Sequence, residues 1–79
     1  METELRQILR EILELEDIEV QPTLKRTEVD SWDSLRHLRL VTAVEEEFGI
    51  RFSMEEIRSI EGITELQNLV SAKAAKPLP

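Results

Sequence analysis

A chain of 79 residues is long enough for one small domain with a single core, and 41% apolar against 34% charged residues is typical of a globular protein. The net charge of −7 argues against a nucleic-acid partner, and the absence of cysteine excludes disulfides, thiolate metal sites and a protein thiol nucleophile. No apolar run approaches the roughly 20 residues that span a bilayer, and the first residues lack the pattern of a signal peptide, so we expect a cytoplasmic protein with no membrane span.

The first predicted element is an amphipathic helix over about residues 2–15, because its apolar residues recur at intervals of three and four. They are Leu5, Ile8, Leu9, Ile12 and Leu13. Residues 16–33 lack this period, and Pro22 removes a backbone donor there. Apolar residues alternate with polar ones from Ile18 through Val20 to Leu24, which predicts a long loop attached to the core. A loop of this length in so small a domain suggests a function.

A second helix is predicted from Ser34 to Phe48, with one apolar side. That side carries Leu38, Leu40, Val41, Val44 and Phe48. Gly49 follows directly, where a left-handed helix cap is commonly glycine. A short extended link over residues 50–52 then leads to the third helix.

Two capping patterns predict the remaining helices. Ser53 and Glu56 open a brief third helix, with Met54, Ile57 and Ile60 turned inward and Gly62 as its end. Thr64 and Gln67 repeat the spacing and open the last helix, which carries Leu66, Leu69 and Val70. We therefore expect an all-α four-helix bundle of three longer helices and one short helix, with a long first loop. Residues 1–75 would form a single domain and residues 76–79 a flexible C-terminal tail.

The turn that leads into the second helix contains Asp33 and Ser34. Both residue types favour a helix start, so one interpretation is that they only cap the helix. A phosphate ester on Ser34 would also be well placed, because unpaired backbone N–H groups and the positive end of the helix dipole face that position. A chain without cysteine would need an attached group for any thioester chemistry.

These residues also carry a resemblance to a known family. Asp33-Ser34-Leu35 stands at the head of the second helix, followed by Glu45-Glu46-Glu47-Phe48, by Ile50, and by Glu55-Glu56 in the short helix. In this order and spacing, over nearly the whole chain, the sequence resembles the acyl carrier protein family, as a specialised free-standing member.

The resemblance implies a carrier of the same fold over residues 1–75 and not an enzyme, with no catalytic residues and no metal site. A phosphopantetheinyl transferase using Mg²⁺ would move 4′-phosphopantetheine from coenzyme A onto Ser34. The thiol of that arm would hold an acyl group as a thioester and present it to acyl-loading and acyl-using enzymes. Asp33 would help the transferase recognise the site, and Leu35 would contact partners. We expect a monomer.

Basic residues distinguish this chain from typical fatty-acid carriers. Arg36, Arg39 and Arg58 stand where those carriers are acidic, whereas acidic side chains remain at Glu45 and Glu46. Because like charge penalises docking on a mismatched partner, we expect dedicated partner enzymes of a specialised lipid, fatty-acid, polyketide or other secondary-metabolite pathway.

Partner recognition is accordingly assigned to residues around Ser34 and on the short helix. They are Asp33, Leu35, Arg36, Arg39, Glu45, Glu46 and Ile57. Two other functions stay open from the sequence. The chain could be an aminoacyl or peptidyl carrier, or an unmodified helical interaction module of the same fold.

Two residues near Ser34 have a structural and a functional interpretation. Trp32 is either the core aromatic of the loop, which we favour, or a lid over the first turn of the second helix. His37 lies near the apolar face of its helix, and no further ligands converge on it for a metal. We expect His37 to hydrogen-bond the loop backbone and so hold the loop against the second helix.

Overall fold

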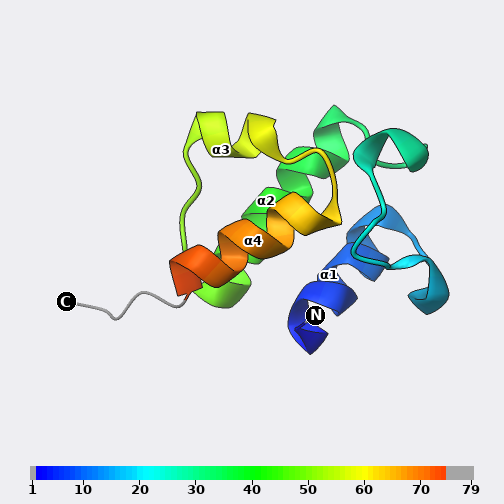
Figure 1. Ribbon diagram of the computed structural model, residues 1–79, viewed down its shortest axis with the longest axis horizontal. Coiled ribbons are helices and arrows are strands. Elements are labelled where there is room, and N and C mark those ends of the chain that lie inside the picture. Colours follow the sequence, from blue (N-terminus) through cyan, green and yellow to red (C-terminus); the bar gives the residue numbers. More distant parts are fainter. Residues whose placement is uncertain (1, 75–79) are drawn as a thin grey trace.

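The computed structural model describes residues 2–74 and contains the four helices expected from the sequence (Figure 1). They are α1 (Thr3–Leu13), α2 (Ser34–Phe48), α3 (Met54–Ser59) and α4 (Ile63–Ala74). The loop between α1 and α2 holds two single-turn 3₁₀ helices, η1 (Asp17–Glu19) and η2 (Arg26–Glu28). No strand occurs in this part of the chain, which confirms the all-α bundle of three longer helices and one short helix. The predicted tail at residues 76–79 lies outside the described residues.

One apolar core joins the three longer helices, with the loop and the segment around α3 packed onto it. Its helical members are Leu5, Leu9 and Leu13 of α1, Leu40, Val41 and Val44 of α2, and Ile63, Leu66 and Val70 of α4. Burial of one such side chain stabilises the fold by about 1.5–3 kcal/mol, so this core holds the helices in fixed positions around the turn before α2. None of the helices within residues 2–74 has the length and apolar character needed to cross a membrane.

Helix α1 is shorter than the predicted range of residues 2–15. It ends at Leu13, because Glu14 adopts a left-handed conformation (φ 55°) and donates its backbone N–H to the carbonyl of Arg10. The predicted end at residue 15 was wrong because the apolar period continues to Leu15. This side chain is half-buried against the core but comes after the end of the helix. The turn at Glu14 brings its side chain to α2.

The long loop is attached to the core as predicted, but not through every apolar residue. Val20 is fully buried and Leu24 packs at the edge of the core. The prediction for Ile18 was wrong, since this side chain is 80% exposed. Ile18 lies within η1, where the 3₁₀ period replaces the alternation of an extended chain. Arg6 of α1 fixes this part of the loop by donating to the carbonyls of Asp17 and Val20 at 3.2 and 3.1 Å.

Gly62 does not end the short helix, contrary to the prediction. Helix α3 stops at Ser59, and Gly62 forms an isolated bridge with Lys25 of the loop. A Cβ atom at Gly62 would lie 2.7 Å from the carbonyl oxygen of Leu24, so only glycine allows this close approach.

The predicted capping pair Thr64 and Gln67 is also wrong, because α4 already begins at Ile63. The Thr64 hydroxyl instead donates to the carbonyl of Pro22, in the long loop. The start of α4 is therefore fixed by the loop rather than by a local capping pair.

The local caps around α2 and α3 are confirmed. Gly49 adopts φ 63° after α2, and Ser53 and Glu56 form the reciprocal capping box of α3. Two apolar residues expected to face inward are instead exposed, Leu38 by 52% and Met54 by 59%. Met54 is the first residue of a six-residue helix in which only Glu56 and Ile57 are half-buried. The inward position next to Leu38 is taken by His37.

Candidate functional site

The turn before α2 places Asp33 and Ser34 at the helix start. Asp33 is the N-cap, and its Oδ1 accepts the backbone N–H of Arg36 at 2.8 Å. Such a cap typically stabilises a helix by about 1 kcal/mol. Ser34 is the first helical residue and its side chain is exposed.

The surroundings of Ser34 fit a phosphate ester. Among the described residues, no hydrogen bond engages the Ser34 hydroxyl. Asp33 satisfies the N–H groups of Arg36 and His37, the latter through its carbonyl at 2.9 Å, whereas the N–H groups of Ser34 and Leu35 precede the first intrahelical bond. Two backbone donors and the positive end of the α2 dipole are thus available beside this hydroxyl.

An apolar groove runs beside this turn, between α1 and α2. It is lined by Ile12, Leu35, Leu38, Arg39, Thr42, Ala43 and Glu46. Leu35 is 60% exposed, and its neighbour in the groove, Leu38, is exposed as well. Three of the residues that the sequence assigned to partner recognition, Leu35, Arg39 and Glu46, therefore share one surface next to Ser34.

Other residues of that predicted set make contacts within the protein. The Arg36 guanidinium lies 2.9 Å from the Glu14 carboxylate and 4.0 Å from Asp33 Oδ2, and it donates to the carbonyl of Ser31 at 3.4 Å. Glu45 Oε2 accepts the backbone N–H of Phe52 at 2.9 Å, which holds the link to α3. Arg36 and Glu45 therefore hold the loop and the α3 link against α2.

Ile57 lies apart from the groove, half-buried on α3. The structure thus does not bring the predicted partner-recognition residues into one patch. Leu35, Arg39 and Glu46 form one surface with the turn of Asp33 and Ser34, and Ile57 belongs to another element.

A buried pair of side chains lies directly behind the site. Trp32 and His37 are 3% and 5% exposed, and the Trp32 indole N–H donates to His37 Nδ1 at 2.8 Å. The other ring nitrogen, His37 Nε2, lies 2.9 Å from the carbonyl oxygen of Ile57 on α3. Trp32 is thus a core aromatic, as favoured from the sequence.

The structural role expected for His37 is confirmed, but its predicted partner is wrong. It binds the side chain of Trp32 and the backbone of α3, not the loop backbone. Burial lowers the pKa of His37, the carbonyl of Ile57 opposes this shift, and the positive charge of Arg26 adds to it, with a net lowering. His37 is therefore neutral at neutral pH.

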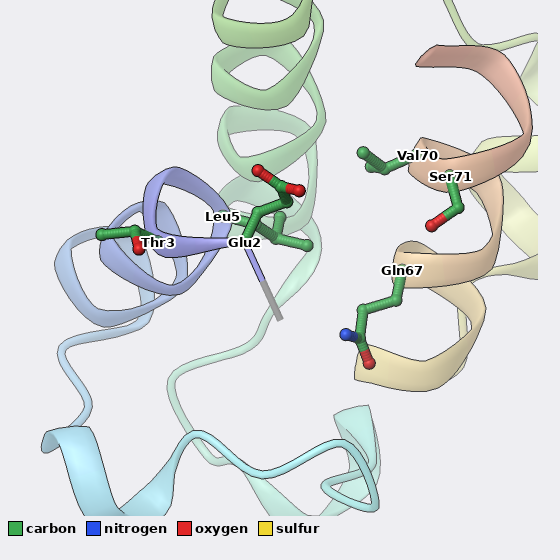
Figure 2. A pocket seen from close by; sticks show the side chains of 6 residues that line it. All are labelled: Glu2, Thr3, Leu5, Gln67, Val70 and Ser71. Atoms are coloured by element: carbon green, nitrogen blue, oxygen red, sulfur yellow. The ribbon is translucent and has the colours of Figure 1, made fainter. Parts of the chain in front are cut away.

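A separate hollow lies at the other end of α1 and is not part of this site. Figure 2 shows Gln67, Val70 and Ser71 extending from α4 toward the first residues of α1, where Glu2, Thr3 and Leu5 complete the lining. The turn of Ser34 instead meets the last residues of α1, through Glu14 and Arg36. Within residues 2–74 no group of three or more His, Asp or Glu side chains is placed to hold a metal ion.

A capped helix start with an exposed serine, inside a small four-helix bundle, fits the class of carrier domains. The family model for the phosphopantetheine attachment site matches residues 3–71, nearly the whole described chain. The protein belongs to this family, in agreement with the resemblance to acyl carrier proteins.

Membership establishes the cofactor and the general role. Domains of this family are sites of covalent 4′-phosphopantetheine attachment and serve as carriers, typically without catalytic activity of their own. Their partners are a phosphopantetheinyl transferase and the enzymes of a pathway.

Proposed function

We propose that the chain is an acyl carrier protein that bears 4′-phosphopantetheine on Ser34 and holds an acyl group as a thioester. The observation that supports this most strongly is the exposed Ser34 hydroxyl at the first position of α2, beside the Asp33 cap. The family is defined by phosphopantetheine attachment, and Ser34 stands at the start of α2, where a phosphate group is favoured.

The attachment step follows from the chemistry of coenzyme A. The Ser34 Oγ forms a bond to the phosphorus that bears the pantetheine, the bond from that phosphorus to the bridging oxygen of the pyrophosphate breaks, and adenosine 3′,5′-bisphosphate leaves. The hydroxyl proton passes to the transferase or to solvent, and the Mg²⁺ ion belongs to the transferase. The bound arm supplies the thiol that a chain without cysteine lacks.

The carrier's own residues would orient the arm and select partners. The N–H groups of Ser34 and Leu35 would face the phosphodiester charge. The transferase would recognise Asp33. Partner enzymes would bind at the groove of Leu35, Arg39 and Glu46 and would also contact Ile57 on α3. Because this groove combines a cation with an anion beside exposed leucines, it favours partners of a specialised lipid or secondary-metabolite pathway over those built for an acidic carrier.

We further propose that the chain is a cytoplasmic monomer and catalyses no step itself. These three statements, together with the single-domain organisation, stay predictions from the sequence. The aminoacyl or peptidyl carrier and the unmodified interaction module are the alternatives that the following experiment and later loading assays must separate.

The test is the intact mass of the protein after incubation with coenzyme A, Mg²⁺ and a transferase of broad specificity. We expect one phosphopantetheine per chain. Protein that stays unmodified with several transferases, while a known carrier is modified in the same reaction, would favour the interaction module. Loading of the modified protein by acyl-transferring rather than by amino-acid-activating enzymes would distinguish the two carrier types.

A further inference from the structure

His37 joins three elements through two hydrogen bonds of its ring. It lies on α2, it accepts from Trp32 in the turn before Ser34, and it contacts the carbonyl of Ile57 on α3. The residue is 5% exposed, so water does not replace either bond easily. The attachment turn and α3 are therefore connected through one side chain.

The two partners determine the protonation of the ring. The Trp32 indole N–H can only donate, so His37 Nδ1 must accept and carries no proton. A backbone carbonyl can only accept, so Nε2 carries the proton and donates it to Ile57. Only the neutral ring with its proton on Nε2 satisfies both partners.

The bond to Ile57 serves as a cap for α3. The last carbonyls of a helix lack intrahelical partners, and the backbone N–H of Ile60 reaches the Ile57 carbonyl only at 3.4 Å. His37 Nε2 lies nearer, at 2.9 Å. A helix of six residues has few other anchors: here they include the half-buried Ile57, the buried Ile60 that follows the helix, and the ion pair of Glu56 with Lys73 of α4 at 2.9 Å.

We propose that His37 is a positioning residue that holds α3 and the turn of Ser34 in one fixed arrangement for the transferase, and that its protonation releases this arrangement. The proposal rests on the proposed function of Ser34. It differs from a merely stabilising role because each of the two hydrogen bonds positions a different element.

Acid would break the connection at Trp32. A proton on Nδ1 would face the indole N–H, so that two donors would meet where one bond exists now. The positive charge of Arg26 in η2, which donates to the Trp32 carbonyl at 3.4 Å, opposes this protonation. The neighbouring elements carry two further arginines, Arg36 of α2, whose charge Glu14 partly balances, and Arg58, next to Ile57 in the sequence of α3.

The sign of the pH dependence follows from the lowered pKa of His37. As the pH falls, His37 is protonated in the unfolded chain before it is protonated in the folded protein. Its contribution to the free energy of unfolding is therefore fully present above the ordinary histidine pKa and is lost as the pH falls through the lower pKa of the folded state. The chain contains one tryptophan and one histidine, so Trp32 fluorescence, which a protonated imidazole quenches, reports on this one ring.

Two conservative variants separate the two bonds. In His37→Asn the amide oxygen takes the place of Nδ1 and keeps the Trp32 partner, but the side chain does not reach Ile57. In His37→Gln the amide nitrogen takes the place of Nε2 and keeps the Ile57 partner, but the bond to Trp32 is lost. Val44→Ala is the control, because it removes buried volume from the same helix away from the turn.

We expect wild-type Trp32 fluorescence to fall in one step with a midpoint below the ordinary histidine pKa, together with faster amide exchange in α3. At neutral pH, His37→Asn should speed amide exchange in α3 and leave the Trp32 indole N–H resonance in place. His37→Gln should shift the Trp32 indole N–H resonance and leave amide exchange in α3 unchanged. Both variants should lower kcat/KM for phosphopantetheine transfer by about tenfold, as expected for a displaced reacting group, while Val44→Ala keeps it.

Equal losses of kcat/KM in all three variants, or none in the two His37 variants, would overturn the proposal. Should the variants fail to fold, a wild-type titration without faster exchange in α3 would overturn it instead. If wild type takes up no phosphopantetheine, the proposed function is wrong, whereas the fluorescence and exchange measurements still decide whether His37 joins Trp32 to α3.

Discussion

Replacement of Ser34 by alanine is expected to abolish phosphopantetheine addition completely while leaving the fold almost unchanged. The hydroxyl would be the acceptor atom, and alanine supplies none. Ser34 is exposed, the helix cap is made by Asp33, and alanine is a good helix former, so the free energy of unfolding should change by no more than about 0.5 kcal/mol. Intact mass and urea denaturation of the same preparation measure both effects.

The matched control is Ser31→Ala, the other serine of the same turn. The Ser31 hydroxyl donates to the carbonyl of Leu13 at 2.6 Å, so its loss should lower stability by about 1 kcal/mol. This variant should still take up one phosphopantetheine. A full mass increase on Ser34→Ala, or its loss on Ser31→Ala, would contradict the assignment of Ser34.

Trp32→Ala is expected to have the largest effect on stability, a loss of about 3–5 kcal/mol. It would leave a cavity behind the turn of Ser34 and would remove the donor from the buried Nδ1 of His37. In a chain of this size such a loss is a large part of the total stability. Urea denaturation followed by circular dichroism measures it.

Trp32→Phe is the graded comparison, since it keeps an aromatic ring and removes only the indole donor and part of the volume. We expect its loss of stability to lie between those of wild type and Trp32→Ala. A loss below about 1 kcal/mol for Trp32→Ala would show that Trp32 is not a core residue.

Features coded by neighbouring residues could be predicted from the sequence. Helix α2 was predicted from Ser34 to Phe48 and found there, because Asp33 and Gly49 mark its two ends. The capping box of Ser53 and Glu56 likewise identified the start of α3. Such caps involve contacts within one turn of the chain and need no knowledge of the tertiary structure.

Features that depend on contacts between distant segments could not be predicted. Gly62 is required by the backbone of Leu24, and Thr64 donates to Pro22 rather than capping its own helix. The periodicity of α1 continued past Leu13, although the chain turns at Glu14. For Gly62 and Thr64, a segment far away in the sequence determines what the residue does. The end of α1 is set locally, by the left-handed conformation of Glu14, which the apolar period does not reveal.

The candidate site shows the same division. Asp33 and Ser34 could be recognised from a local motif and from the resemblance to carriers. The contacts of Arg36 with Glu14 and of His37 with Ile57 could not, because they join residues that lie 22 and 20 positions apart. The sequence indicated that His37 lies toward the core, but not that α3 ends against it.

The most direct test is to locate the modification within the wild-type chain. After treatment with the transferase, coenzyme A and Mg²⁺, the protein would be digested and its peptides fragmented in a mass spectrometer. We predict that phosphopantetheine is found on Ser34 and on no other serine or threonine. A modified chain that carries the group on Ser31, Ser53 or any other residue would contradict the proposed site.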